Sequence, residues 1–284
     1  MFMRLPVAPL ALALALAAGC NPYDVLPIDE PLPRPATLTS TSLDGSIALT
    51  WSDEPYRADP TRFRLYRVYS ASYDLDADVC RMPWSLEGTT VAPEFVAGAL
   101  ANGVSRCFTI TGESVDGVES ARSPVRFDTP RYQTNGAALT ARQADPAQAS
   151  FRFWRDIDGD GRAVRAELGR VGSATTADAD FVVERDGSGR LFLTPRRAGV
   201  AIAVWGNAPV SSITEIDLAP STGYSAAGIE ALPGWGYVVE MRGPDGFKRF
   251  GALRIISVGQ GLIVFDWAYQ SDPGNPELIR APDA

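Results

Sequence analysis

The chain has 284 residues, a formal net charge of -8 and a sequence pI near 4.7, so a nucleic-acid-binding surface is not expected. Hydrophobic residues make up 45% of it, which excludes a disordered protein, and 26 glycines with 22 prolines favour short strands and turns over long helices. The absence of histidine excludes Ser-His-Asp and Cys-His catalysis and histidine-bound zinc or haem.

Residues 1–19 predict a cleaved export signal. An apolar run over residues 5–18 is shorter than the roughly 20 residues that cross a bilayer. The run leads into Leu16-Ala17-Ala18-Gly19-Cys20, which resembles the lipobox of bacterial lipoproteins, although Ala17 stands where leucine is usual. The resemblance implies that Cys20 is lipidated and becomes the first mature residue. Ordinary secretion, with Cys20 left as a thiol, is the alternative.

The expected lipid places the chain in the cell envelope. Asn21, not aspartate, follows the cysteine, so nothing favours retention in an inner membrane, and we expect an outer-membrane lipoprotein. The membrane is then a partner through the N-terminal lipid. Residues 20–35 contain five prolines and no strand or helix periodicity. They predict an extended tether, which at about 3 Å per residue spans roughly 40 Å.

A regular pattern of short strands begins at residue 36. Alternating apolar residues between turn signals predict strands over residues 36–41, 46–51, 63–69, 88–95, 106–111 and 123–129. A short edge strand fits between Ser70 and Trp84. These elements predict a seven-stranded β-sandwich over residues 36–130.

Four short motifs make the sandwich more specific. They are Leu49-Thr50-Trp51, Tyr66-Arg67-Val68-Tyr69, Cys107-Phe108-Thr109-Ile110 and Gly117-Val118-Glu119-Ser120. With them, residues 36–130 resemble a fibronectin type III domain. The tyrosine corner of that family falls on Arg106, so its hydrogen bond must be replaced. The resemblance implies a domain that binds or spaces and does not catalyse.

Two cysteines remain once Cys20 is assigned to the lipid. Cys80 and Cys107 are then expected to form a disulfide in an oxidising compartment. Cys107 alternates with Phe108 and Ile110 and should point away from the sandwich core. Two separate thiols are the alternative.

A second β domain is expected over residues 150–284, after a polar linker at residues 131–149. Predicted strands cover residues 150–155, 180–184, 191–194, 200–205, 213–216, 236–241, 247–258 and 262–269. Glycine-rich turns between the last three predict an antiparallel meander. No helix longer than about two turns is expected. The predicted fold class is therefore all-β, with a fibronectin type III sandwich followed by a second antiparallel β domain.

The second domain opens with a candidate calcium site. Residues 156–167 place carboxylates Asp156, Asp158, Asp160 and Glu167 at positions 1, 3, 5 and 12 of the twelve-residue EF-hand loop, with glycine at position 6. Arg162, at position 7, would contribute its carbonyl oxygen. The loop resembles an EF-hand loop, but its flanks do not predict the two helices. The alternative is a solvated acidic turn whose charge nearby arginines partly offset.

The last predicted strand carries Phe265, Trp267 and Tyr269 in alternation. They predict a core ladder, and a platform for a sugar or lipid ring is the alternative. This end of the chain, together with residues 236–239 and 251–255, resembles uncharacterised secreted bacterial lipoproteins, some distantly similar to HmuY-like haem-binding proteins. Haem binding does not carry over, because the matching region has no histidine and Met241 alone as a methionine.

The residues favour a lipid-anchored envelope protein that binds or scaffolds and is not an enzyme, with a protein or glycan of the envelope as its ligand. A glycan-acting hydrolase with a fibronectin type III spacer is the alternative, and a purely structural envelope protein is a third. Paired carboxylates for hydrolysis could come from Asp180, Glu184, Glu215 or Asp217. No phosphate-binding loop, nucleotide fingerprint or nucleophile elbow is present.

Overall fold

The computed structural model describes residues 30–74, 77–243 and 245–278. Within these ranges the fold is all-β, as predicted, and the only α-helix is α1 (Glu54–Ala58). The expected signal peptide and the lipidated Cys20 lie outside the described residues, as does the expected tether up to residue 29.

In the described part of the chain, no helix is both long enough and apolar enough to span a membrane.

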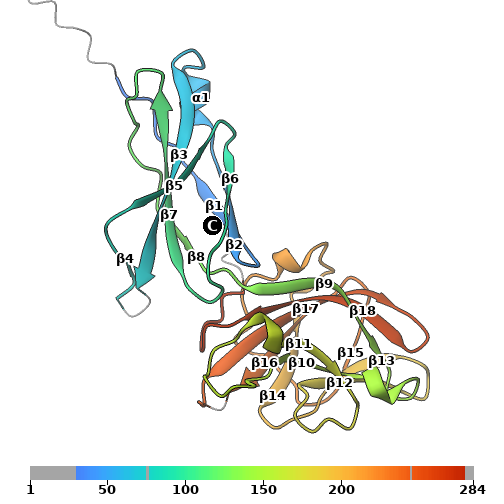
Figure 1. The fold of residues 1–284 in the computed structure, drawn as a ribbon. Helices are drawn as coiled ribbons and strands as arrows, with labels where there is room; N and C mark the ends of the chain where they lie inside the picture. Colours follow the sequence, from blue (N-terminus) through green and yellow to red (C-terminus); the bar gives the residue numbers. More distant parts are fainter. Residues whose placement is uncertain (1–29, 75–76, 244, 279–284) are drawn as a thin grey trace, which may run out of the picture. The chain divides into compact units, whose positions relative to one another are not determined.

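The first region consists of two facing groups of antiparallel strands (Figure 1). One group has the order β1-β2-β6, and the other has the order β4-β3-β7-β8 with β5 also pairing with β3. The strands are β1 (Leu38–Leu43), β2 (Ser46–Trp51), β3 (Phe63–Asp74), β4 (Val79–Cys80), β5 (Ser85–Thr90), β6 (Glu94–Ala97), β7 (Arg106–Ser114) and β8 (Arg126–Asp128). This is a fibronectin type III-like sandwich.

The core of this sandwich uses the apolar faces that the alternating pattern predicts. Trp51 packs edge-on against Tyr66, with ring centroids 5.3 Å apart, and Phe108 and Ile110 of β7 are fully buried beside them. The single strand expected at residues 88–95 is instead two strands, β5 and β6. Pro93 lies between them, and a proline cannot donate a ladder hydrogen bond, so the pairing with β3 ends before it.

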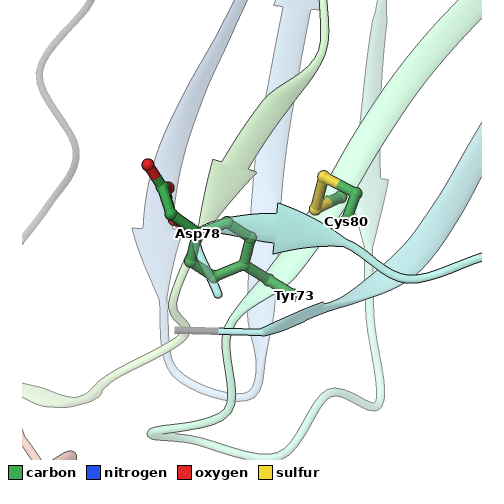
Figure 2. The surroundings of a disulfide bond; sticks show 4 residues. Tyr73, Asp78 and Cys80 are labelled. Atoms are coloured by element: carbon green, nitrogen blue, oxygen red, sulfur yellow. A yellow bond between two sulfur atoms is a disulfide. The ribbon is translucent and has the colours of Figure 1, made fainter. Parts of the chain in front are cut away.

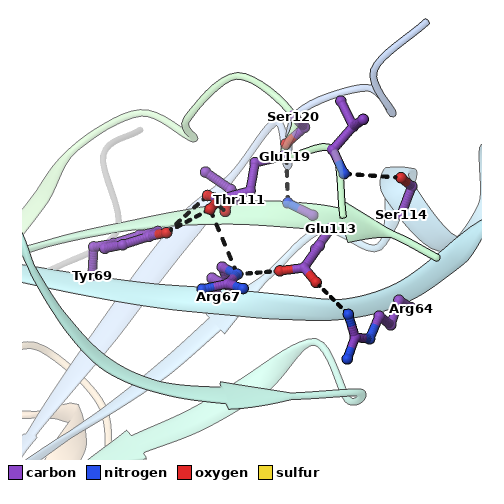
Figure 3. A network of polar contacts seen from close by, with 10 residues as sticks. Arg64, Arg67, Tyr69, Thr111, Glu113, Ser114, Glu119 and Ser120 are labelled. Carbon is purple, nitrogen blue, oxygen red and sulfur yellow. Dashed lines mark hydrogen bonds and ion pairs between the residues drawn. The ribbon is translucent and has the colours of Figure 1, made fainter. Parts of the chain in front are cut away.

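The outer face of β3 and β7 carries a closed network of charges (Figure 3). The buried Glu113 carboxylate accepts from Arg64 at 2.9 Å and from Arg67. Glu119 accepts from the Tyr69 hydroxyl at 2.8 and 2.9 Å, and lies 3.5 Å from the Arg67 guanidinium. Each carboxylate of the network therefore faces a matching donor.

The second region contains two five-stranded antiparallel sheets, with orders β11-β10-β12-β13-β15 and β14-β16-β17-β18-β9. The strands are β9 (Tyr132–Thr140), β10 (Ser150–Trp154), β11 (Leu168–Gly172), β12 (Phe181–Arg185), β13 (Leu191–Pro195), β14 (Val200–Trp205), β15 (Ile229–Glu230), β16 (Gly236–Arg242), β17 (Lys248–Val258) and β18 (Leu262–Gln270). Short 3-10 turns are η1 (Pro146–Gln148), η2 (Arg165–Glu167) and η3 (Ile213–Glu215).

An aromatic core lies between these two sheets. Phe151 of β10 contacts Phe265 and Trp267 of β18, with ring centroids 5.3 and 5.7 Å apart, and Phe153 stacks with Tyr269 at 6.2 Å. The ladder predicted in the last strand is therefore part of the core. A second apolar cluster covers the other face of β16, β17 and β18, so these strands are buried on both faces. The predicted meander of these three strands is confirmed.

Three expectations differ from the structure. The expected linker at residues 131–149 contains β9, which pairs with β18 as a sheet edge, because alternate residues such as Leu139 reach the core. Residues 213–216 lie in and directly after η3, where Ser212 caps the turn by accepting from the Thr214 amide at 3.1 Å. At the end of the expected tether, Leu32 is buried and does not extend into solvent.

Candidate metal centre

The acidic segment forms the loop of a hairpin, and this geometry brings its two ends together. Strand β10 ends at Trp154 and β11 begins at Leu168, and these two residues are antiparallel partners. The Arg155 amide also donates to the Glu167 carbonyl at 3.0 Å. Glu167 therefore returns beside Asp156 although eleven positions separate them. Strands flank the loop where an EF-hand has helices, in keeping with the flanking sequence.

Backbone amides hold the loop carboxylates in place. The Asp156 carboxylate accepts from the Gly159 amide at 2.7 Å and from the Gly161 amide at 3.1 Å. Both glycines have positive φ, +77° and +75°, which lets the chain curl around Asp156 without steric cost. Asp158 accepts from the Asp160 amide at 3.2 Å. The loop thus curls around its own first carboxylate.

Glu167 is the buried member of the site, with 2% of its surface exposed. Its Oε1 accepts from the Ile157 amide at 2.6 Å and its Oε2 accepts from the Trp154 indole at 3.0 Å. Burial alone would raise the pKa of this carboxyl, but these hydrogen bonds outweigh it and hold the pKa below its ordinary value. The buried group is therefore the carboxylate, the form that binds a cation.

The structure brings together three of the five predicted ligands. Carboxylate oxygens of Asp156, Asp158 and Glu167 all lie within 4.8 Å of one another, so they can hold a metal ion. Asp160 is not in this group, and its Oδ1 accepts from the Arg162 amide at 2.7 Å. Arg162 enters the prediction through its carbonyl oxygen alone, and that role stays a prediction.

Two of the arginines that could neutralise the loop are engaged elsewhere. Arg155 lies 3.7 Å from Asp178, and Arg165 forms an ion pair with Asp44. Neither forms an ion pair with the three carboxylates of the triad within the described residues. These two arginines therefore do not neutralise the triad directly, although Arg249 interacts electrostatically with Asp156.

The predicted disulfide is present in the first region (Figure 2). Cys80 of β4 is bonded to Cys107 of β7, with Cα atoms 6.0 Å apart, inside the usual range for a disulfide. Cys107 lies outside the core cluster that contains Phe108, as its alternation predicts, and is fully buried. Arg106, at the position of the missing tyrosine corner, donates to Ser70 at 2.5 Å and to Glu87 at 3.1 Å.

The carboxylates considered for glycan hydrolysis have separate partners. Asp180 is fully buried and accepts from Arg197 at 2.8 Å, and burial raises its pKa. Glu184 accepts from Arg142 at 3.2 Å, and the Asp217 carboxylate accepts from the Leu218 amide at 2.6 Å. Glu215 accepts from the Ser211 amide at 3.0 Å. Each of these carboxylates therefore has its own hydrogen-bond donor close by.

No protein-family model matches the chain, and no curated protein matches it. Among solved structures, the chain is similar to a DUF4466 family protein from Parabacteroides merdae, at 8% identity and a TM-score of 0.42, over 83% of this chain and 99% of that one. A Fn3-like protein from Clostridium thermocellum matches at 20% identity and a TM-score of 0.26, over 33% of this chain and 86% of that one. The FN5 domain of Drosophila Lar matches at 16% identity and a TM-score of 0.27, over 35% of this chain and 96% of that one. These likenesses concern the fold and carry no ligand or reaction.

Proposed function

We propose that the protein is a lipid-anchored cell-envelope protein whose C-terminal β domain is a non-catalytic binding or scaffolding module stabilised by a calcium ion. The single observation that carries the calcium assignment is the convergence of Asp156, Asp158 and Glu167 within 4.8 Å. The fibronectin type III-like region, in this proposal, presents that domain away from the membrane. In the same proposal, a lipid on Cys20 anchors the chain in an outer membrane.

Calcium fits the donor set. Calcium takes oxygen ligands at about 2.3 to 2.6 Å, so two oxygens on opposite sides of the ion are at most about 5 Å apart. The spread of the triad agrees with that distance. Three carboxylates in one loop repel each other unless a cation lies between them. Extracellular calcium modules bind at about 0.1 to 1 mM, and we place this site in that range.

Calorimetry on metal-stripped protein tests the calcium site. We expect saturable calcium binding that raises the melting temperature, and at ten times the dissociation constant the gain is about 1.4 kcal/mol. Asp158→Asn should abolish the gain. Asp116→Asn is the matched control, because Asp116 is an exposed aspartate in an Asp-Gly turn of the other region. Absence of heat and of any melting shift at about 10 mM calcium would show that the loop is only a turn.

Fractionation of cell envelopes tests the anchor. The protein should partition with membranes and carry acyl chains on Cys20 by mass spectrometry, and Cys20→Ser should release it. Recovery of the unmodified wild-type protein in the soluble fraction would contradict the anchor. The same native preparation, analysed for co-purifying glycans and proteins, tests the binding role.

The hydrolase alternative is tested separately with a panel of envelope glycans. We expect no turnover, because arginines hold Asp180 and Glu184, and backbone amides or a serine hold Glu215 and Asp217. Turnover that disappears on substitution of one of these carboxylates would replace the binding proposal by the enzyme.

A further inference from the structure

A cavity of about 460 Å³ in the C-terminal domain adjoins the acidic loop without being part of it. Its volume is in the range of small-molecule sites. Four arginines line it: Arg152, Arg197, Arg242 and Arg249. Asp156 is the one carboxylate of the lining. The wall of the cavity therefore presents four cations and one anion.

Three of these arginines have carboxylate partners that lie outside the lining. Arg197 donates to the buried Asp180 at 2.8 Å, and Arg249 is held by Asp245 through two bonds of 2.8 Å. Arg152 is likewise paired with Asp178. Each of these three arginines therefore lines the cavity while it is bound to a carboxylate that does not.

Donors remain available after these contacts are made. The Nη2 groups of Arg152 and Arg197 make no hydrogen bond within the described residues, since both arginines use only Nε and Nη1. Arg242 is exposed, and its guanidinium has neither an ion pair nor a hydrogen bond in the described part of the chain. A guanidinium offers five N–H donors in a planar fork that suits oxyanions.

The hydroxyl of Tyr269 is a further free donor at the wall of the cavity. Tyr269 lines the cavity, is 1% exposed, and its hydroxyl has no hydrogen-bond partner within the described residues. The hydroxyl oxygen is not among the fully buried polar atoms that lack a partner, so it is accessible at the cavity and can donate to a ligand there. Burial raises the pKa of this phenol, so it keeps its proton at neutral pH and remains a donor.

Arg249 is held in place from two sides. Its guanidinium stacks over the Trp154 ring, 4.8 Å from the ring centroid, and its Nη1 also lies against Gly243. A Cβ added to Gly243 would lie 1.8 Å from Arg249 Nη1, so no other residue fits there without displacing the arginine. The donor at the wall of the cavity is therefore preorganised.

We propose that this cavity binds a small organic oxyanion that also carries hydroxyl groups, the chemistry of an acidic sugar. The arginines and the Tyr269 hydroxyl receive the anionic group, and Asp156 accepts from a ligand hydroxyl. The cavity is larger than a bare inorganic anion requires. The assignment names the ligand class of the binding module and so rests on the proposed function, but it requires neither calcium nor the lipid.

Calorimetry with the soluble Cys20→Ser protein in calcium-free buffer tests the site. The probes are glucuronate, inorganic phosphate, and glucose as the neutral control. Glucuronate should bind saturably while glucose produces no heat. Binding of phosphate with none of glucuronate would assign the site to a phosphoryl group and overturn the acidic sugar. No saturable binding of either anion up to about 10 mM, ten times a 1 mM dissociation constant, would overturn the site.

Substitutions then locate the binding. Arg242→Ala, at an exposed and unpaired arginine, should weaken glucuronate at least tenfold, whereas the control Arg196→Ala, an exposed arginine outside the lining, should leave it unchanged. Tyr269→Phe should weaken it severalfold with the melting temperature preserved. Equal losses in Arg242→Ala and Arg196→Ala would show a general charge effect and overturn the assignment. Because no step uses calcium or the membrane, a failure here leaves those two tests of the proposed function intact.

Discussion

Each region contains a cluster of charged side chains, and the two clusters differ in how far their charges are matched. On the outer face of the fibronectin type III-like region, Glu113 binds two arginines and Glu119 binds Tyr69 and lies near Arg67, so the network is complete in itself (Figure 3). In the C-terminal domain, three carboxylates meet with backbone and indole donors only, and Arg242 has no partner within the described residues. Matched charges of the first kind stabilise a fold. The unmatched charges of the second kind are the basis of the two ligand proposals.

The largest expected effect separates the regions by stability. Removing the disulfide with Cys80→Ala/Cys107→Ala should destabilise the first region by about 3 to 4 kcal/mol, because the bond closes a loop of 27 residues. The second region lacks a disulfide in its described residues, and we expect its transition to stay unchanged. Scanning calorimetry of both proteins measures this. A shift of the whole unfolding profile together would contradict independent stabilities.

The matched network predicts a smaller loss. Glu113→Gln removes a buried acceptor from Arg64 and Arg67, which are partly exposed and can turn to water, so we expect a loss of about 1 to 3 kcal/mol. Glu119→Gln, at a more exposed carboxylate of the same network, should cost less than about 1 kcal/mol. Urea unfolding gives both values. Equal costs would mean that burial of Glu113 does not matter.

Much of the fold follows from periodicity. Alternating residues such as Ile47, Leu49 and Trp51 mark β2 with the observed bounds, and the β16 to β18 meander follows from its turns. The sequence pattern did not predict strand β9, because a strand at the edge of a sheet needs few apolar residues. Leu139 is the one residue of that strand that is fully buried. The strand propensity of a short segment does not tell which edge of a distant sheet is free to pair with it.

The two candidate sites differ in how far the sequence predicts them. The acidic loop is visible because its ligands lie within twelve consecutive positions. The arginines of the cavity come from β10, β16, β17 and the segment after β13, and only tertiary packing brings them together. The sequence does not reveal the role of Gly243, because that role is to leave space for the Arg249 side chain.

Alkaline pH offers a matched pair of probes, one in each region. Burial raises the pKa of Tyr66 and of Tyr237 to about 12, above the ordinary 10. The folded state binds these protons more tightly, so their contribution is complete below pH 10 and is lost as pH rises toward 12. At pH 11 the raised pKa of each tyrosine should have lowered the free energy of unfolding by about 1 kcal/mol from its value below pH 10. The melting temperature of a region should fall between about pH 10 and 12. Tyr66→Phe should reduce this fall in the first region only, and Tyr237→Phe in the second region only. A variant that reduces the fall in both regions would contradict this assignment.

The smallest expected effect links the two unmatched sites of the C-terminal domain. Asp156 belongs to the acidic triad and also lines the cavity, where its charge favours the charged form of Arg249. A calcium ion on the triad neutralises this one lining carboxylate, so the arginines should attract an anion more strongly. We expect calcium to tighten glucuronate binding about threefold, close to 0.7 kcal/mol.

Reciprocity makes this coupling testable from both sides, because glucuronate must tighten calcium by the same factor. Calorimetric titration of each ligand with the other at saturation measures the two factors. Asp158→Asn should remove the calcium effect while leaving glucuronate binding in calcium-free buffer intact, because Asp158 does not line the cavity. If calcium instead weakens glucuronate, Asp156 contributes more as an acceptor for the ligand hydroxyl than it costs as a negative charge. In that case the two sites compete for one carboxylate.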